Sequence, residues 1–243
     1  MTGVELAAVV AVVFLAALVQ VTAGFGFSLT AVPLLALAID TRTASMLAAV
    51  LSLVTSSVQA VQGRRDVAWP VARRLVLSAL VGMPFGLLLF ARADDRVLRV
   101  FLGVTTLVLV GLLVKGLDLS RAGHGVDLLA GAAAGVLTTS LNTNGPPLVF
   151  VLHGRGLNPW QFRATITTVF TLVGLVGLCG RAAVGGFTRE VLLACAAAPV
   201  PLVVGMLSGF RLRRHLDPGR FRRLVMALLV LAAISAIVAG VRG

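Results

Sequence analysis

The sequence predicts an all-α polytopic membrane protein built from two inverted repeats. Its residues are 58% hydrophobic and only 12% charged, and the mean hydropathy is +1.03. A soluble domain usually carries about a quarter charged residues, and its surface helices show a polar stripe. The long apolar runs of this chain lack such a stripe. Two further apolar segments are interrupted by polar residues, and the repeats are inferred from them.

Six uninterrupted runs are expected to cross the membrane as ordinary helices. A helix needs about 20 apolar residues to cross about 30 Å of hydrocarbon. The runs have roughly that length and cover residues 43–62, 71–91, 97–114, 164–184, 190–210 and 221–241. Together with the two interrupted segments, they give about eight membrane segments.

The first interrupted segment, residues 4–39, is too long for one perpendicular span. As a straight helix its 36 residues would measure about 54 Å. The second, residues 125–153, is broken between Thr138 and Pro147. Glu5 and Asp127 lie near the starts of the two segments, where an acid complements the helix dipole. The first segment is interrupted by Gln20, Thr22, Gly24, Gly26, Ser28, Thr30 and Pro33.

Each interrupted segment precedes three ordinary spans, so the chain divides into similar halves, residues 1–120 and 121–243, within one integral membrane domain. Each segment is either a single kinked span or a hairpin that returns to the same side. With hairpins, 14 of the 21 Lys and Arg residues are cytoplasmic; with kinked spans, 12 are. The positive-inside rule therefore favours hairpins, inverted halves, and both termini outside the inner membrane.

The net charge of +12 does not indicate a nucleic-acid partner. The arginines gather in short connections such as 64–74, 92–99 and 211–223, where they anchor span ends at a lipid bilayer. Small-residue pairs within the spans predict close helix packing. Packing inside one chain and packing in a homodimer are both open for these pairs, which are Gly82–Gly86, Gly131–Gly135 and Gly205–Gly209.

The second break has a sequence that cannot continue a helix. Pro146 and Pro147 lack amide donors, so one helix is expected to end near Ser140 and another to begin at Pro147. Irregular backbone at membrane depth is tolerated where it is buried or lines a watery cavity. The new helix start would expose amide N–H groups. Neutral side chains beside it add donors, and so do Ser28 and Thr30 at the first break.

Neutral donors and helix N-termini suit an anion. None of the nine carboxylates falls in either break, whereas a cation pathway normally shows an acid at midmembrane depth. Kinks whose polar groups satisfy one another are the alternative, and Arg163 either pairs with the anion or anchors its helix. The predicted substrate site comprises Gly24, Gly26, Ser28, Thr30, Asn142, Thr143, Asn144, Gly145, Pro146, Pro147 and Arg163.

Two motifs resemble those of a known transporter family. The stretch NGPPLVFVLHGRGLNPWQFRATITTVF, residues 144–170, is similar to the second-half signature of the TauE/SafE sulfite exporter family. AGFGFSLTAVPLLAL, residues 23–37, resembles its first-half glycine-rich motif, with GFGF where members often have a longer glycine cluster. The resemblance covers essentially the whole chain. It implies a cytoplasmic-membrane exporter of sulfur oxyanions or organosulfonates, such as sulfite or sulfoacetate.

The resulting hypothesis is a transporter that exports a small anion by alternating access. The anion would leave down the membrane potential, or with a proton as its neutral acid. A transporter of another small carboxylate or inorganic anion is one alternative, and a non-transporting scaffold for a partner enzyme is another. We expect no enzyme activity, cofactor or metal, because the spans contain no nucleophile with its base, no paired acids and no His/Cys cluster.

Overall fold

The computed structural model describes residues 2–23, 25–115 and 123–212, and six isolated positions between 230 and 241. Gly24 and most of the predicted span 221–241 lie outside these ranges. The described chain is helical and contains no strand, which confirms the predicted class. The helices are α1 (Gly3–Ala23), α2 (Phe27–Leu35), α3 (Thr41–Gly63), α4 (Trp69–Arg92), α5 (Asp95–Lys115), α6 (His124–Ser140), α7 (Gly145–Gly154), α8 (Pro159–Ala183), α9 (Arg189–Ala197) and α10 (Pro199–Leu212).

Four of the described helices, α1, α3, α4 and α8, are long and apolar enough to cross a membrane, which makes this a multi-pass protein. A fifth span results if α9 and α10 are counted together, although they are bent by 45°. The sequence predicts a straight helix over 190–210. It is interrupted because Pro199 and Pro201 cannot donate to the carbonyls of Cys195 and Ala197.

The first break is narrower than its polar residues suggest. Helix α1 continues past Gln20 because polar side chains bond within the helix: the Thr22 hydroxyl donates to the Leu18 carbonyl at 2.8 Å. The turn follows at Gly26, whose φ of 104° favours glycine. The first amide of α2, that of Phe27, then donates to the Gln20 side-chain oxygen at 3.0 Å.

The second break follows the predicted course more closely. Helix α6 ends at Ser140, as predicted, and α7 begins at Gly145, two residues earlier than expected. Between them Asn142 has a φ of 57°, in the left-handed region that asparagine tolerates better than most residues. Pro146 and Pro147 then occupy the first turn of α7, where proline fits a helix.

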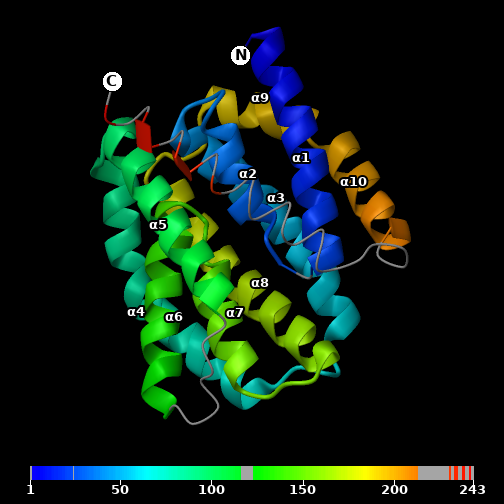
Figure 1. The fold of residues 1–243 in the computed structure, drawn as a ribbon. Coiled ribbons are helices and arrows are strands. Elements are labelled where there is room, and N and C mark those ends of the chain that lie inside the picture. The colour runs from blue at the N-terminus through cyan, green and yellow to red at the C-terminus, as the bar shows by residue number, and fades with distance from the viewer. Residues whose placement is uncertain are drawn as a thin grey trace.

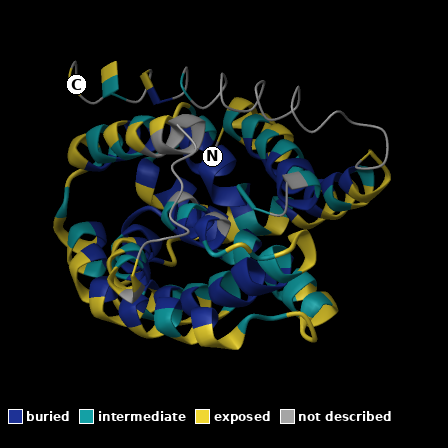
Figure 2. Cartoon of the chain, turned by 60° about the horizontal axis from the view of Figure 1, so that its bottom comes forward, coloured by how far each residue is buried: buried dark blue, intermediate teal, exposed yellow. Residues whose placement is uncertain are grey.

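The helices pack in pairs, and the short helices that follow the breaks, α2 and α7, pack among them. Helix α1 packs against α10, α4 against α6, and α3 against α8 (Figure 1). Helix α2 is almost wholly buried, against α1 and α3, and α7 packs against α6, α5 and α8. Figure 2 shows buried residues on the inner faces and exposed residues around the outside. Many exposed side chains are large and apolar, for example Val81, Phe85 and Val200, as lipid contact requires.

The glycine pairs of the spans pack inside this chain. A methyl group on Gly82 or Gly86 of α4 would overlap backbone of α6, and one on Gly135 would overlap the Ala79 carbonyl of α4. Gly205 and Gly209 of α10 face α1 in the same way. The GxxxG pairs therefore bring α4 close to α6 and α10 close to α1, which is the intrachain alternative.

We expect Gly135→Leu to destabilise the fold by about 3 kcal/mol or more, at the upper end of overpacking effects. The side chain would meet backbone of α4, which no rotamer change can move away. Thermal unfolding in detergent tests this expectation. Gly125→Leu is the matched control, since an added Cβ there meets nothing within 4 Å in the described structure. Equal unfolding temperatures for the two variants would show that this contact is unimportant.

Candidate functional site

A pocket lies between the two breaks, and both halves of the chain line it. Its cavity volume of about 30 Å³ has room for about two or three water molecules. The pocket thus suits a small solute and brings together residues more than 100 positions apart. It is lined by Gln20, Gly26, Phe27, Ser28, Leu29, Ser52, Asn142, Asn144, Gly145, Phe170 and Gly174.

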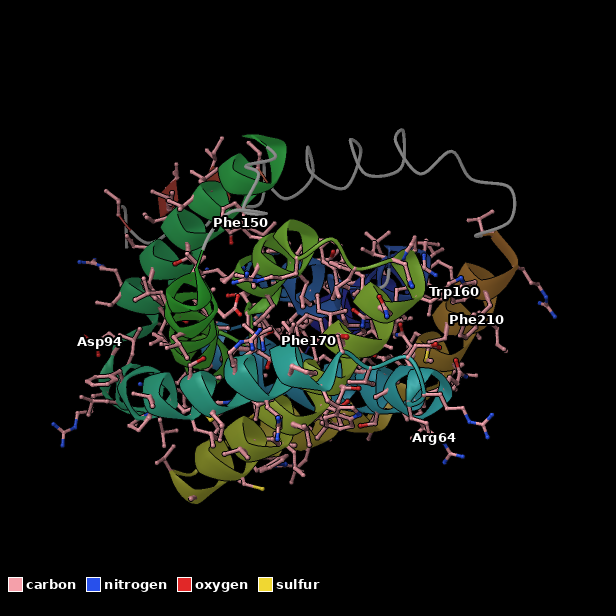
Figure 3. All side chains as sticks on the ribbon, turned by 90° about the horizontal axis from the view of Figure 1, so that it is seen from below. Arg64, Asp94, Phe150, Trp160, Phe170 and Phe210 are labelled. Carbon is pink, nitrogen blue, oxygen red and sulfur yellow. The ribbon has the colours of Figure 1, made fainter. Side chains whose placement is uncertain are left out.

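The pocket lies about half-way along the crossing helices. Ser52 is 11 residues from either end of α3, and Phe170 and Gly174 lie in the middle part of α8. Viewed from below, Phe170 lies near the centre of the bundle and Arg64 at its edge (Figure 3). A methyl group on Gly145 would lie 3.8 Å from Phe170 and 3.9 Å from Phe25. The aromatic rings therefore adjoin the start of α7.

Asn142 connects the two breaks through its side chain. Its amide nitrogen donates to Ser28 Oγ at 2.7 Å and to Ser52 Oγ at 3.0 Å, and its Oδ1 accepts from Arg181 Nη2 at 3.3 Å. Both amide hydrogens of Asn142 are therefore engaged within the protein. The sequence suggested a free donor for an anion, whereas the structure gives Asn142 an organising position between α2, α3 and α8.

Other groups leave donors for a ligand. Because Ser28 Oγ accepts from Asn142, the hydroxyl proton of Ser28 is available to a solute. Asn144 uses one amide hydrogen on Thr138 Oγ1 at 2.7 Å and retains a second. Gly145 adds the first amide of α7, while the prolines that follow it have none. The pocket therefore offers a few neutral donors.

The remaining predicted site residues lie outside the pocket lining. Thr30 and Thr143 are buried, and their hydroxyls have no hydrogen-bond partner in the described part of the chain. Pro147 is half-buried and is not part of the lining. The side chain of Pro146 and the whole of Gly24 are outside what the structure describes.

Arg163 lies in the second turn of α8, because this helix begins at Pro159 rather than near residue 164. Its Nη2 donates to the Thr22 carbonyl at 3.5 Å, at the end of α1. Arg163 thus connects α8 to the start of the first break without lining the pocket.

Arg181 is the functional candidate that sequence reasoning missed. Its side chain is 0% exposed, and besides Asn142 it contacts the Ser45 carbonyl at 3.4 Å and the Phe90 ring at 5.7 Å. Its place near the end of predicted span 164–184 is typical of an arginine that anchors a helix at the membrane surface. Gln20, Ser52, Phe170 and Gly174 were also absent from the predicted site.

Among the described residues, none that lines the pocket is acidic. Asp127 is fully buried, where Arg74 donates to it at 2.9 Å and Arg155 at 2.6 Å. It therefore holds α4, α6 and the end of α7 together, beyond complementing a helix dipole. Among the described residues, no group of three or more His, Cys, Asp or Glu could hold a metal ion.

The profile of the family described as "Sulfite exporter TauE/SafE" matches residues 9–236. The chain belongs to this family. The match confirms the resemblance carried by the two motifs, and it makes the protein a membrane transporter of the sulfite exporter type.

Two relatives show how far the TauE/SafE similarity extends. The "Probable sulfite/organosulfonate exporter TauE" of Cupriavidus necator is 25% identical over 221 residues, covering 87% of this chain and 85% of the relative. The "Probable inner membrane transporter protein TsaS" of Comamonas testosteroni is 28% identical over 174 residues, covering 70% of this chain and 73% of the relative. No solved structure matches the chain.

Proposed function

We propose that this TauE/SafE protein exports a small anion, sulfite or an organosulfonate such as sulfoacetate, across the inner membrane. The observation that carries the proposal is the pocket between the two breaks, whose described lining has neutral donors and no acidic side chain. Such a lining favours an anion over a cation. The names of the two relatives support a transporter, and the first of them supports a sulfur-containing substrate.

Alternating access would use the two halves, residues 1–120 and 121–243, as inverted repeats. In this scheme α6 corresponds to α1, α7 to α2, α8 to α3, and α9 with α10 to α4. The packing of α1 on α10 then has its counterpart in α6 on α4, and α3 meets its own counterpart α8. This exchange of contacts supports a two-fold relation with the substrate site at the interface of the repeats.

The positive-inside count places the ends of α3 and α7 and the start of α6 on the cytoplasmic side. Both termini then lie outside, and each break is a hairpin tip at midmembrane depth. The pocket would serve both sides in turn as the halves rock against each other.

Efflux from proteoliposomes tests the function directly. We expect purified protein to release trapped sulfite or sulfoacetate faster than empty liposomes do. The dependence on a pH gradient distinguishes export with a proton from export down the membrane potential. If the folded protein releases neither anion, a sulfur substrate is wrong. A single stoichiometric partner that co-purifies regardless of substrate would then favour the scaffold.

Asn144→Ala is expected to lower substrate affinity about 5- to 150-fold, because removing one direct hydrogen-bond donor costs about 1 to 3 kcal/mol. The efflux assay over a range of anion concentrations measures it. Gln62→Ala, which removes an exposed amide near the end of α3, is the matched control and should leave affinity unchanged. Unchanged affinity in Asn144→Ala would place the anion away from this side chain.

A further inference from the structure

Arg181 carries a buried charge for which the described chain provides no carboxylate. Its guanidinium has five N–H donors, yet its hydrogen bonds to Asn142 and Ser45 are long, at 3.3 and 3.4 Å. Its Nε has no partner among the described residues. The Phe90 ring offers a cation–π contact, which compensates a buried cation only in part.

Three partly buried arginines of the described chain have a carboxylate partner. Arg74 and Arg155 share the buried Asp127, and Arg99 pairs with Asp95. Burying an unpaired charge is costly, and a cation at membrane depth that has no acidic partner typically marks a ligand or ion pathway. Because no described carboxylate pairs with Arg181, a bound anion is the candidate for its counter-charge.

The guanidinium adjoins the pocket on one defined side. Arg181 lies seven residues beyond Gly174 along α8, about 10 Å. Ser45, which the guanidinium contacts, precedes Ser52 along α3 by the same number of residues. The position of Arg181 in α8 and its contact with Ser45 therefore both place the guanidinium toward the end of the bundle where α3 begins. Asn142 bridges the interval: its Oδ1 accepts from Arg181 and its amide nitrogen contacts Ser28 and Ser52 of the pocket.

We propose that Arg181 supplies the positive charge of the anion site. In the empty pocket Arg181 holds Asn142 in place. When an anion is bound, the guanidinium stabilises the negative charge of the anion from the other side of Asn142. Arg181 is thus a positioning residue that selects anions, and it lies next on the path toward the side proposed to be external. The inference rests on the proposed anion export and assigns the charge that the neutral lining lacks.

The first test measures sulfite transport into proteoliposomes over a range of concentrations. Arg181→Gln is expected to raise the KM for sulfite about tenfold or more, because charge-assisted hydrogen bonds are the stronger ones. Arg181→Lys should recover part of the loss, since it keeps the charge without the planar fork. Arg42→Gln is the matched control: Arg42 is exposed in the first turn of α3, and it should keep the wild-type KM.

A second measurement separates this inference from the transport proposal. Sulfite should raise the unfolding temperature of the wild type and of Arg42→Gln in detergent, but not that of Arg181→Gln. Stabilisation that depends on Arg181, without transport, would support the inference and overturn the proposed function. If sulfite and sulfoacetate neither stabilise the wild type nor are transported by it, the inference and the proposed function are both overturned.

Asn142→Asp keeps the test decisive if Arg181→Gln unfolds. The carboxylate would sit against Arg181 and neutralise it, so we expect sulfite transport and sulfite stabilisation to be lost while the unfolding temperature is maintained or raised. Retention of the wild-type KM in Asn142→Asp, or in a folded Arg181→Gln, would overturn the assignment.

Discussion

Replacing Asp127 with asparagine is expected to destabilise the protein by about 2 to 4 kcal/mol. Removing one member of a buried ion pair typically costs about 3 to 5 kcal/mol, because the partner charge stays behind. Here two arginines would lose their counter-charge. The value is at the lower end because Arg74 and Arg155 are 30% and 18% exposed, so water screens them.

The effect should appear as a lower unfolding temperature in detergent. Asp66→Asn is the control with the same chemical change, because Asp66 is exposed in the connection between α3 and α4. This variant should have the unfolding temperature of the wild type. Since Asp127 also holds Arg155 just after α7, the loosened helix should reduce transport as well. Identical unfolding of the two variants would show that water already solvates the three charges.

The sequence predicts the class of this fold well because apolar length is a strong constraint in lipid. The predicted spans 43–62, 71–91 and 164–184 correspond to α3, α4 and α8 within a few residues. The end of α6 at Ser140 follows from the two prolines nearby. The bend between α9 and α10 was not predicted, because Pro199 and Pro201 lie within an apolar run that was interpreted by its length alone.

The first break shows why polar residues overstate an interruption. Gln20 and Thr22 interrupt the apolar run in sequence, yet neither interrupts α1. The Thr22 hydroxyl bonds back to its own helix, and Gln20 caps the amide of Phe27 across the turn. A single sequence shows the polar residues of a membrane helix but not their hydrogen-bond partners. At the first break, the sequence therefore located the glycine turn but not the end of α1.

The pocket between the breaks was predicted in outline, and the buried arginine beside it was not. Ser28, Asn142, Asn144 and Gly145 come together as the paired breaks suggest. Arg181 lies close to the end of predicted span 164–184, where the positive-inside rule interprets an arginine as an anchor at the membrane surface. Arg181 is buried because α8 packs against α3 and α4, and this packing is tertiary information.

Removing the side chain of Asn142 is expected to slow sulfite transport about 10- to 150-fold. Asn142→Gly would abolish the contacts with Ser28, Ser52 and Arg181, and one of these is a charge-assisted hydrogen bond worth about 1.5 to 3 kcal/mol. Glycine accepts the φ of 57° at this position without strain. Initial efflux rates from proteoliposomes measure the loss.

Asn142→Ala separates the amide from the backbone. It loses the same contacts but places a Cβ in the left-handed region, so it should transport as poorly as Asn142→Gly and unfold at a lower temperature. If Asn142→Gly kept the wild-type rate while Asn142→Ala lost it, the requirement would be for the turn alone. Equal loss in both variants would instead mean that this amide, held between Ser28 of one half and Arg181 of the other, sets the geometry in which an anion is carried.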